Sequence, residues 1–156
     1  QFTFNTEQAA GNGRYRGGYG LVRDYRILGE EAFLTATFGR FKYPPWGANG
    51  GGDGSPNAVE IILRGATTPS LRRGKLARYR LARGDLARLI TGSGGGYGDP
   101  LERDPDRVRN DVRDELLTPT QAAAIYGVVI GPVGSSLDQA ATDSLRRRDR
   151  PNPPRP

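Results

Sequence analysis

Apolar residues recur in two different rhythms along this chain, and the change between them divides the sequence into two parts. From residue 20 to residue 91, short apolar runs are separated by glycine-rich connections, which is the pattern of β-strands. From residue 104 to residue 148, helix start signals recur at regular intervals instead. The order predicts an α+β fold, in which a mainly antiparallel β-sheet is followed by a short helical C-terminal segment.

Five strands are predicted from the apolar runs, and two hairpins from the turns between them. The runs lie at residues 21–28, 32–38, 58–64, 76–81 and 86–91. Gly29-Glu30-Glu31 has the length and composition of a hairpin loop, so the first two runs are predicted to pair with each other. Arg83-Gly84-Asp85 supplies turn residues for antiparallel pairing of the last two, with Gly84 in a backbone conformation that other residues avoid. The same triplet is an integrin-recognition motif in secreted proteins, but a tight turn explains it more simply.

The fourth run has the alternation of a half-buried strand. Ala77, Tyr79 and Leu81 fall on one face, and Arg78 and Arg80 fall on the other. This arrangement predicts that one face of the strand packs on a core while the other lies in water.

The first helix of the C-terminal segment has a clear start. Asp104 is a favourable N-cap, and Pro105 occupies the first helical position. Val108, Val112 and Leu116 then recur at a spacing of four among charged neighbours. Such spacing is typical of a surface helix with one apolar face.

Two further helices are predicted from capping signals. Thr118-Pro119-Thr120-Gln121 is a capping box that opens the second helix, and Gly127 is placed to end it. Ser136-Leu137-Asp138-Gln139 repeats the same device for a third helix. The apolar run Val128-Val129-Ile130 between these helices is predicted to be an edge strand.

Composition divides the chain into four segments around one modest core. Its 156 residues are 35% apolar, which is enough for one domain with tails. The segments are a glycine-rich leading segment (1–19), a β-rich region (20–103), a helical C-terminal segment (104–148) and a proline-rich tail (149–156).

One long connection is too rich in glycine to be a plain turn. Residues 43–57 contain Pro44, Pro45 and the single tryptophan, Trp46, and connections of this length are usually functional or disordered. The prolines and the tryptophan argue against disorder. Trp46 is expected to anchor the core, and the alternative is a contact with a partner or ligand.

The most unusual segment is the glycine-rich stretch 91–100. Gly94, Gly95, Gly96 and Gly98 could present backbone N–H groups to a phosphate or carboxylate. A P-loop would also need a Gly-Lys-Ser/Thr ending, which the segment lacks. The favoured interpretation is a crowded crossing of chain segments in which side chains do not fit.

An arginine-glycine-tyrosine segment at residues 11–20 has the composition of an RNA-binding segment. It occurs once and runs directly into an apolar strand, whereas such segments usually repeat within tails. A glycine-rich turn leading into the sheet is therefore favoured.

The absence of histidine and cysteine excludes most familiar active sites. Histidine is the usual general base and the commonest metal ligand, and cysteine is needed for thiolate sites and disulfides. The acidic residues between Asp99 and Glu115 match no calcium-binding loop, so capping and surface roles are expected for them. The sequence therefore predicts no catalytic residue and no metal site in this chain.

Charge and hydropathy narrow the class of protein further. The net charge of +6 comes from scattered arginines, with one run at Arg146-Arg147-Arg148, so charge alone only weakly favours nucleic acid as a partner. No apolar window is long enough to span a bilayer, and the start has no signal-peptide pattern, so a soluble cytoplasmic protein is expected. Without any methionine, the chain is expected to be processed or to derive from something longer.

These motifs and their order along the chain resemble those of the hydantoinase B/oxoprolinase family. The resemblance begins with the glycine-rich segment 13–20 and continues through Pro44-Pro45-Trp46-Gly47. It is strongest in residues 94–105, followed by Val108, Asp111-Val112, Ala122-Ala123 and the run from Tyr126 to Val129. It covers about residues 11–130 and corresponds to the C-terminal portion of an N-methylhydantoinase B, 5-oxoprolinase or acetone carboxylase-type subunit.

The resemblance implies an ATP-dependent enzyme complex that opens a cyclic amide such as a hydantoin, an oxoproline or a lactam. The family's metal-binding residues belong to a part this chain lacks, so ATP and a divalent metal are expected elsewhere in the complex. Expected partners are the remainder of the hydantoinase B-type subunit and an ATP-using hydantoinase A-type subunit. Neither membrane nor nucleic acid is expected as a partner. The alternatives are a ketone carboxylase subunit and a free-standing RNA-binding module.

Four residues are candidates for contacts near the interface or the substrate, namely Arg16, Trp46, Tyr97 and Asp99. The chain is expected to shape part of the complex without carrying its catalytic groups, and to be inactive by itself.

Overall fold

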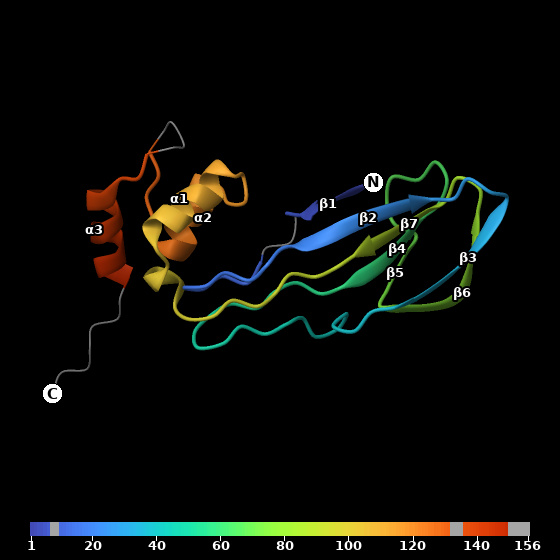
Figure 1. Ribbon diagram of the computed structural model, residues 1–156, viewed down its shortest axis with the longest axis horizontal. Helices are drawn as coiled ribbons and strands as arrows, with labels where there is room; N and C mark the ends of the chain where they lie inside the picture. The colour runs from blue at the N-terminus through green and yellow to red at the C-terminus, as the bar shows by residue number, and fades with distance from the viewer. Residues whose placement is uncertain (7–9, 132–135, 150–156) are drawn as a thin grey trace.

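The computed structural model describes residues 1–6, 10–131 and 136–149, and it places strands and helices at opposite ends of an elongated molecule (Figure 1). The strands are β1 (Phe2–Asn5), β2 (Gly20–Arg26), β3 (Glu31–Thr37), β4 (Ala58–Ile62), β5 (Leu71–Arg73), β6 (Lys75–Ala82) and β7 (Leu86–Ile90). The helices are η1 (Pro100–Glu102), α1 (Pro105–Arg113), α2 (Pro119–Tyr126) and α3 (Gln139–Asp149). The predicted α+β class is confirmed.

The strands form two antiparallel sheets that pack against each other. The larger sheet has the order β1-β2-β7-β4-β5, and the smaller one consists of β3 and β6. Val59, Ile61, Leu81 and Ala87 form the buried cluster between them, and each is at most 3% exposed. Because a single two-stranded sheet is only marginally stable in water, the smaller sheet depends on this contact.

Both predicted hairpins are wrong, although the five predicted strands lie where they were predicted; β1 and β5 were not predicted. β2 pairs with β1 and β7, whereas β3 pairs with β6, so each turn carries the chain from one sheet to the other. The two turns bond to each other: Ile27 N–H donates to Asp85 O at 2.9 Å, Gly84 N–H to Ile27 O at 2.8 Å and Arg83 N–H to Glu30 O at 3.1 Å. This exchange of partners lets both pairs of strands face one core. Gly84 has the expected left-handed conformation, with φ of +92°.

A bulge changes the predicted alternation of β6. Tyr79 and Leu81 point toward the core as predicted, but Ala77 is exposed. The register shifts between Leu34 and Ala36 of β3, and the bulged residue Arg78 has φ of +47°. Because a bulge inserts one extra residue into β6, the residues that precede it point to the opposite side of the strand. Leu76 therefore faces the core in place of Ala77.

The outer face of the larger sheet carries a row of alternating charges across four strands. Strand register places Asp24, Arg88, Glu60 and Arg72 side by side in that order. Arg88 donates to both oxygens of Asp24 at 2.8 Å, and Arg72 donates to Glu60. Opposite charges on neighbouring strands stabilise the register of the sheet.

Acid is expected to weaken this end of the molecule. The hydrogen bond from Arg88 lowers the pKa of Asp24, and backbone N–H bonds from Ala82 and Arg64 lower the pKa of Asp85. A carboxyl group whose pKa is lower in the folded than in the unfolded state stabilises the fold at every pH above its unfolded-state pKa. This stabilisation is lost as the pH falls through its folded-state pKa. The free energy of unfolding should therefore stay constant from neutral pH down to about pH 5 and decrease below about pH 4.

Urea titrations at a series of pH values test this expectation. The double variant Asp24→Asn with Asp85→Asn should be less stable at pH 7 and should show a shallower loss in acid. A slope below pH 4 equal to that of the unchanged chain would show that other carboxyls dominate acid unfolding.

The first two helices form where capping signals predicted them. Asp104 accepts a hydrogen bond from Asp106 N–H, and Val108 and Val112 of α1 are buried in a second core. The Thr118–Gln121 capping box is formed, and Gly127 ends α2 with φ of +60°.

The region after α2 differs from the prediction in two ways. Asp138, not Ser136, accepts the bond from Ala141 N–H that caps α3. The predicted edge strand at 128–130 is wrong, because Ile130 makes a single bridge to Leu137 and Val128 is buried in the helical core. These residues connect helices, so they have no sheet to join. Most of the proline-rich tail, 150–156, lies outside the described residues.

Candidate functional site

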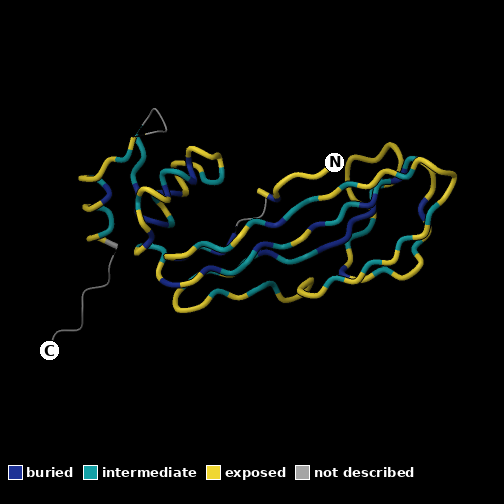
Figure 2. Tube along the Cα trace, viewed as in Figure 1, coloured by how far each residue is buried: buried dark blue, intermediate teal, exposed yellow. Residues whose placement is uncertain are grey.

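Three glycine-rich segments lie side by side between the sheets and the helices, and together they form what we call the glycine layer, residues 11–18, 47–54 and 92–98. Backbone bonds join all three. Gly11 N–H donates to Gly94 O at 3.0 Å, Gly52 N–H to Asn12 O at 2.7 Å and Gly96 N–H to Gly52 O at 2.9 Å. Figure 2 shows buried residues on two of these connections, 11–18 and 92–98, whereas 47–54 is intermediate or exposed. The layer is therefore an ordered part of the fold.

The segments approach so closely that side chains cannot fit between them. A Cβ atom on Gly96 would lie 1.8 Å from Asn12 O, and one on Gly95 would lie 2.1 Å from Trp46 O. Real Cβ atoms essentially never come within 3.0 Å of another heavy atom. The predicted crowded crossing is confirmed, and it explains why this stretch is rich in glycine.

The alternative role, an anion-binding nest, conflicts with where the N–H groups point. Gly94 donates to Gly18 O, Gly96 to Gly52 O and Gly98 to Ala48 O, each at 2.9 Å. These three amides are occupied by neighbouring backbone, so they stabilise the layer and are not free to hold a phosphate or carboxylate.

A cluster of opposite charges joins the glycine layer to the helical end. Arg16 donates to the two oxygens of Asp111 at 3.3 and 3.2 Å, and Arg103 donates to Asp111 at 2.9 Å. The side chains of Arg16, Asp111 and Arg103 are 15%, 10% and 8% exposed, so water screens their interaction little. We call these three residues the junction cluster.

Two tyrosines enclose the junction cluster. The Arg16 guanidinium lies 4.6 Å from the ring centre of Tyr19, whose hydroxyl donates to Leu116 O at 2.6 Å. The Arg103 guanidinium lies 5.7 Å from the ring centre of Tyr126, which is 1% exposed. Burial raises the pKa of both tyrosine hydroxyls, so each stays neutral and available as a hydrogen-bond donor.

A cleft of about 500 Å³ opens beside the cluster, between the glycine layer and α2. Arg16, Tyr19 and Gln121 supply polar groups to its wall, and Ile125 supplies apolar surface. These three groups already have partners within the chain: Arg16 bonds to Asp111, Tyr19 to a carbonyl, and Gln121 closes the capping box of α2. The arrangement holds the two ends of the molecule together. The carboxylates of Asp53 and Glu115 also line the cleft, and Asp53 accepts a bond from Gly47 N–H at 2.9 Å.

Of the predicted site residues, Arg16 and Tyr97 lie in the glycine layer and Trp46 and Asp99 lie directly next to it, but their side chains do not converge. Arg16 points inward to the junction cluster. Tyr97 is 51% exposed, accepts a bond from Asn49 Nδ2 at 2.6 Å and pairs through its backbone with Tyr15. Asp99 caps η1 by accepting from Leu101 N–H at 2.9 Å.

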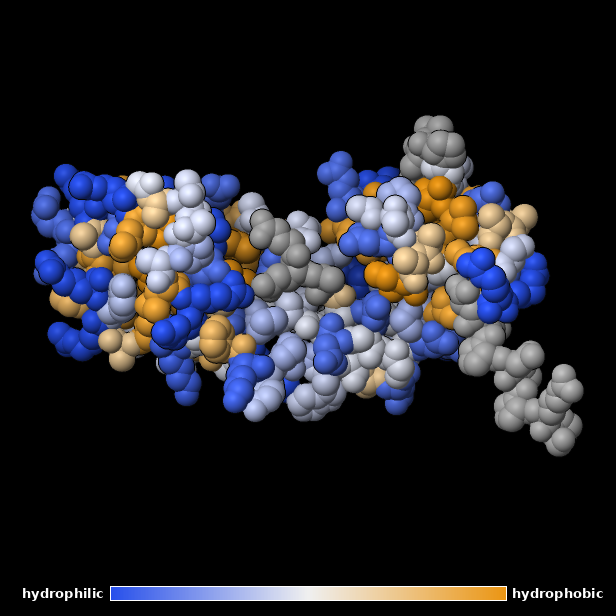
Figure 3. All heavy atoms as spheres, turned by 180° about the vertical axis from the view of Figure 1, so that it is seen from behind, coloured by the Kyte–Doolittle hydropathy of each residue, from blue (hydrophilic) through white to orange (hydrophobic). Residues whose placement is uncertain are grey.

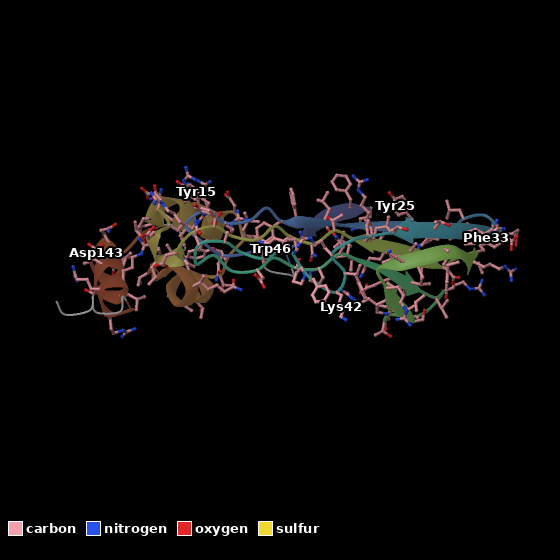
Figure 4. The ribbon with its side chains drawn as sticks, turned by 90° about the horizontal axis from the view of Figure 1, so that it is seen from below. Tyr15, Tyr25, Phe33, Lys42, Trp46 and Asp143 are labelled. Atoms are coloured by element: carbon pink, nitrogen blue, oxygen red, sulfur yellow. The ribbon has the colours of Figure 1, made fainter. Side chains whose placement is uncertain are left out.

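The expectation that Trp46 anchors the core is wrong. Its side chain, labelled in Figure 4, is 70% exposed. It is covered on one side by Arg40, whose guanidinium lies 4.5 Å from the ring centre. The backbone explains this outcome, because the Trp46 carbonyl is held against Gly95 inside the glycine layer and the ring is directed outward. An exposed tryptophan fits the alternative role, a contact with a partner.

Sequence reasoning missed the importance of Asp111, which it grouped with surface carboxylates. A signal was present, since Asp111 lies three residues after Val108 and one before Val112, on the buried face of α1. In the parts of the chain that the structure describes, no group of three or more acidic residues is arranged to hold a metal ion. No helix there is long and apolar enough to cross a membrane.

The segment with the composition of an RNA-binding sequence is integrated into this junction. Arg16 and Tyr19, two of the residues such a module would use, are engaged with Asp111 and Leu116. Single-stranded RNA is bound by exposed, stacking side chains, so this packing favours the structural role.

Comparison with known proteins identifies relatives for nearly the whole chain. The family model described as hydantoinase B/oxoprolinase matches residues 1–100. A putative D-/L-hydantoinase B-type subunit from Pseudomonas sp. (strain NS671) is 35% identical over 135 residues, which are 86% of this chain and 22% of that protein.

Two solved structures share the fold. The ATP-dependent caprolactamase from Pseudomonas jessenii matches with a TM-score of 0.69 and 28% identity, over 94% of this chain and 25% of that one. A nucleotide-free structure of acetone carboxylase matches with a TM-score of 0.60 and 20% identity, over 94% of this chain and 24% of that one, and shows the fold alone. The chain thus spans about a quarter of the length of these relatives.

Proposed function

This chain belongs to the hydantoinase B/oxoprolinase family, and from that premise we propose that it is part of an enzyme complex that hydrolyses a cyclic amide with the use of ATP. The proposed substrate is a hydantoin, an oxoproline or a lactam. Similarity to a hydantoinase B-type protein and to an ATP-dependent caprolactamase supports this class of reaction.

The chain's own task in the complex is structural. The observation that carries this assignment is that Arg16, Tyr19 and Gln121, which line the cleft, are held by bonds within the chain, Arg16 by Asp111, Tyr19 by Leu116 O and Gln121 by the cap of α2. Groups that already have partners stabilise a shape better than they transfer protons. ATP and a divalent metal are proposed to bind elsewhere in the complex, where they would activate the ring amide and the attacking water.

The proposed partners are the remainder of a hydantoinase B-type polypeptide and an ATP-using hydantoinase A-type polypeptide. A chain that spans a quarter of its relatives and leaves large aromatic side chains exposed is suited to lie against more polypeptide. The proposed contacts are Tyr97 in the glycine layer and Trp46 directly before its second segment, at 51% and 70% exposure.

Substitution of Tyr97 tests this function. Tyr97→Ala removes an exposed ring and the bond from Asn49, and it is expected to reduce ATP-dependent ring opening by the purified complex about tenfold, equivalent to about 1.4 kcal/mol of lost contact. Asp99→Ala should act in the same direction through loss of the cap of η1, which is typically worth about 1 kcal/mol.

Tyr43→Ala is the matched control, because Tyr43 is a 69% exposed aromatic residue outside the glycine layer. Rates would be measured with hydantoin, oxoproline and a lactam, together with incorporation of bicarbonate into a ketone. Unchanged ring opening and unchanged co-purification in both variants would contradict the proposed contacts. ATP-dependent carboxylation without ring opening would replace the proposed reaction by that of a carboxylase.

A further inference from the structure

The two packed sheets differ in width, and this leaves part of an inner face uncovered. The larger sheet has five strands and the smaller sheet has two. Tyr25 of β2 is the register partner of Ala87, a residue of the core between the sheets, so the Tyr25 side of β2 is the inner side. Phe2 and Phe4 of β1 share that side, because Phe4 pairs with Leu21 and Phe2 with the residue two positions further along β2.

These inner-face aromatic residues lie in solvent. Phe2, Phe4 and Tyr25 are 71%, 67% and 50% exposed. In a sheet sandwich, residues on this side are normally covered by a strand of the opposite sheet. Figure 3 shows exposed apolar atoms among charged ones over the sheet end of the molecule.

An apolar groove continues this uncovered face toward the smaller sheet. It has a volume of about 250 Å³ and is lined by aliphatic and aromatic side chains, including Tyr25, Ile27, Phe33 and Leu89. Phe33 is 55% exposed, and Figure 4 shows it at the same end of the molecule as Tyr25. None of the groove-lining residues is charged, so its occupant must present apolar side chains.

The groove runs beside a strand that has a free edge. In the part of the chain that the structure describes, β3 pairs with β6 along one edge and has no strand along the other. A free edge presents unpaired N–H and C=O groups to any extended segment that lies next to it. A strand placed there would lie over β2 and β1, where the uncovered aromatic residues are.

We propose that a β-strand from the remainder of the hydantoinase B-type polypeptide adds to β3, fills the groove and completes the smaller sheet over β2 and β1. This proposal rests on the proposed function for the identity of the polypeptide. The size of the relatives supports the occupant, since they contain about three quarters of a chain beyond the part matched here. The occupant is an extended segment whose alternate side chains are apolar, because main-chain bonds to β3 give affinity and the groove selects the side chains.

Hydrogen exchange on the complex tests the position of the added strand. The tagged chain would be purified with the hydantoinase B-type polypeptide that accompanies it, identified by mass spectrometry, and compared with the tagged chain alone. Amides of residues 31–37 on the free edge should exchange at least about tenfold more slowly in the complex, because they become bonded to the added strand. Protection confined to other regions would overturn the proposal.

A pair of substitutions provides an independent measurement. Phe4→Lys with Tyr25→Lys is expected to weaken binding of the polypeptide at least about tenfold, and Tyr43→Lys, at a comparably exposed aromatic residue outside the groove, is expected to leave it unchanged. Both substituted residues of the pair are half exposed or more, so circular dichroism of the free variant should match that of the unchanged chain.

The outcomes separate this proposal from the proposed function. Co-purification of the polypeptide without protection of β3, and with full binding by the Lys pair, overturns the added strand and leaves the function standing. Failure of any hydantoinase B-type polypeptide to bind overturns both. Protection of β3 by a second copy of this chain, recognised by a doubled mass in solution, overturns the proposed occupant.

Discussion

Replacing Asp111 with alanine is expected to lower the free energy of unfolding by about 3–5 kcal/mol, the largest effect expected of any charged residue described in this chain. Its carboxylate is the shared partner of Arg16 and Arg103, and all three side chains are at most 15% exposed. Without it, two guanidinium groups would remain close together in a site with little water. The Nε atom of Arg103 already has no hydrogen-bond partner among the described residues, so the site has little capacity to compensate.

Urea unfolding followed by circular dichroism would measure this loss. Glu102→Ala is the matched control: Glu102 pairs with Arg14 at 3.6 Å, but both side chains are about half exposed, so its removal should change stability by about 1 kcal/mol or less. A similar small change for Asp111→Ala would mean that the junction cluster does not hold the helical end to the glycine layer.

Gly96→Ala is expected to destabilise the chain by about 2–4 kcal/mol, because the new methyl group would lie 1.8 Å from Asn12 O. Neither atom can move easily, since Gly96 N–H is bonded to Gly52 O and Gly52 N–H is bonded to Asn12 O. The substitution must therefore separate two segments of the glycine layer. Thermal unfolding and backbone amide exchange within residues 92–98 would both report this change.

Gly18→Ala separates crowding from a general effect of removing glycine. A Cβ atom at Gly18 has no heavy atom within 4 Å, so alanine there should be neutral or stabilise the chain by up to about 1 kcal/mol. If both variants had equal stability, the close approach of the glycine segments would not be needed for the fold.

The glycine layer gives a physical reason for the family resemblance. Glycines at the crossings are required by contacts between backbones, and such contacts do not depend on a substrate. The layer positions the sheets and the helices relative to each other, which suits the structural role proposed for this chain.

Features that depend on neighbouring residues were determined by the sequence itself. The Asp104 and Thr118 caps and the stop at Gly127 lie where they were predicted, because a cap needs only a few consecutive residues. The extents of the main strands followed equally from local alternation. The glycine crossing could be inferred because few other causes concentrate glycine so strongly.

Features that depend on distant partners were decided by the tertiary structure. A turn between two apolar runs looks the same whether the strands pair with each other or enter different sheets, so β2 and β3 were wrongly joined. Trp46 was expected inside, yet its backbone packs against Gly95 and its ring is exposed. Asp111 is a buried partner of two arginines. One of them, Arg16, is 95 positions away in the sequence and meets Asp111 only in the folded chain. Local sequence fixes the conformation of the backbone, but the free energy of burying a face or a charge depends on what lies opposite, and only the folded chain supplies that.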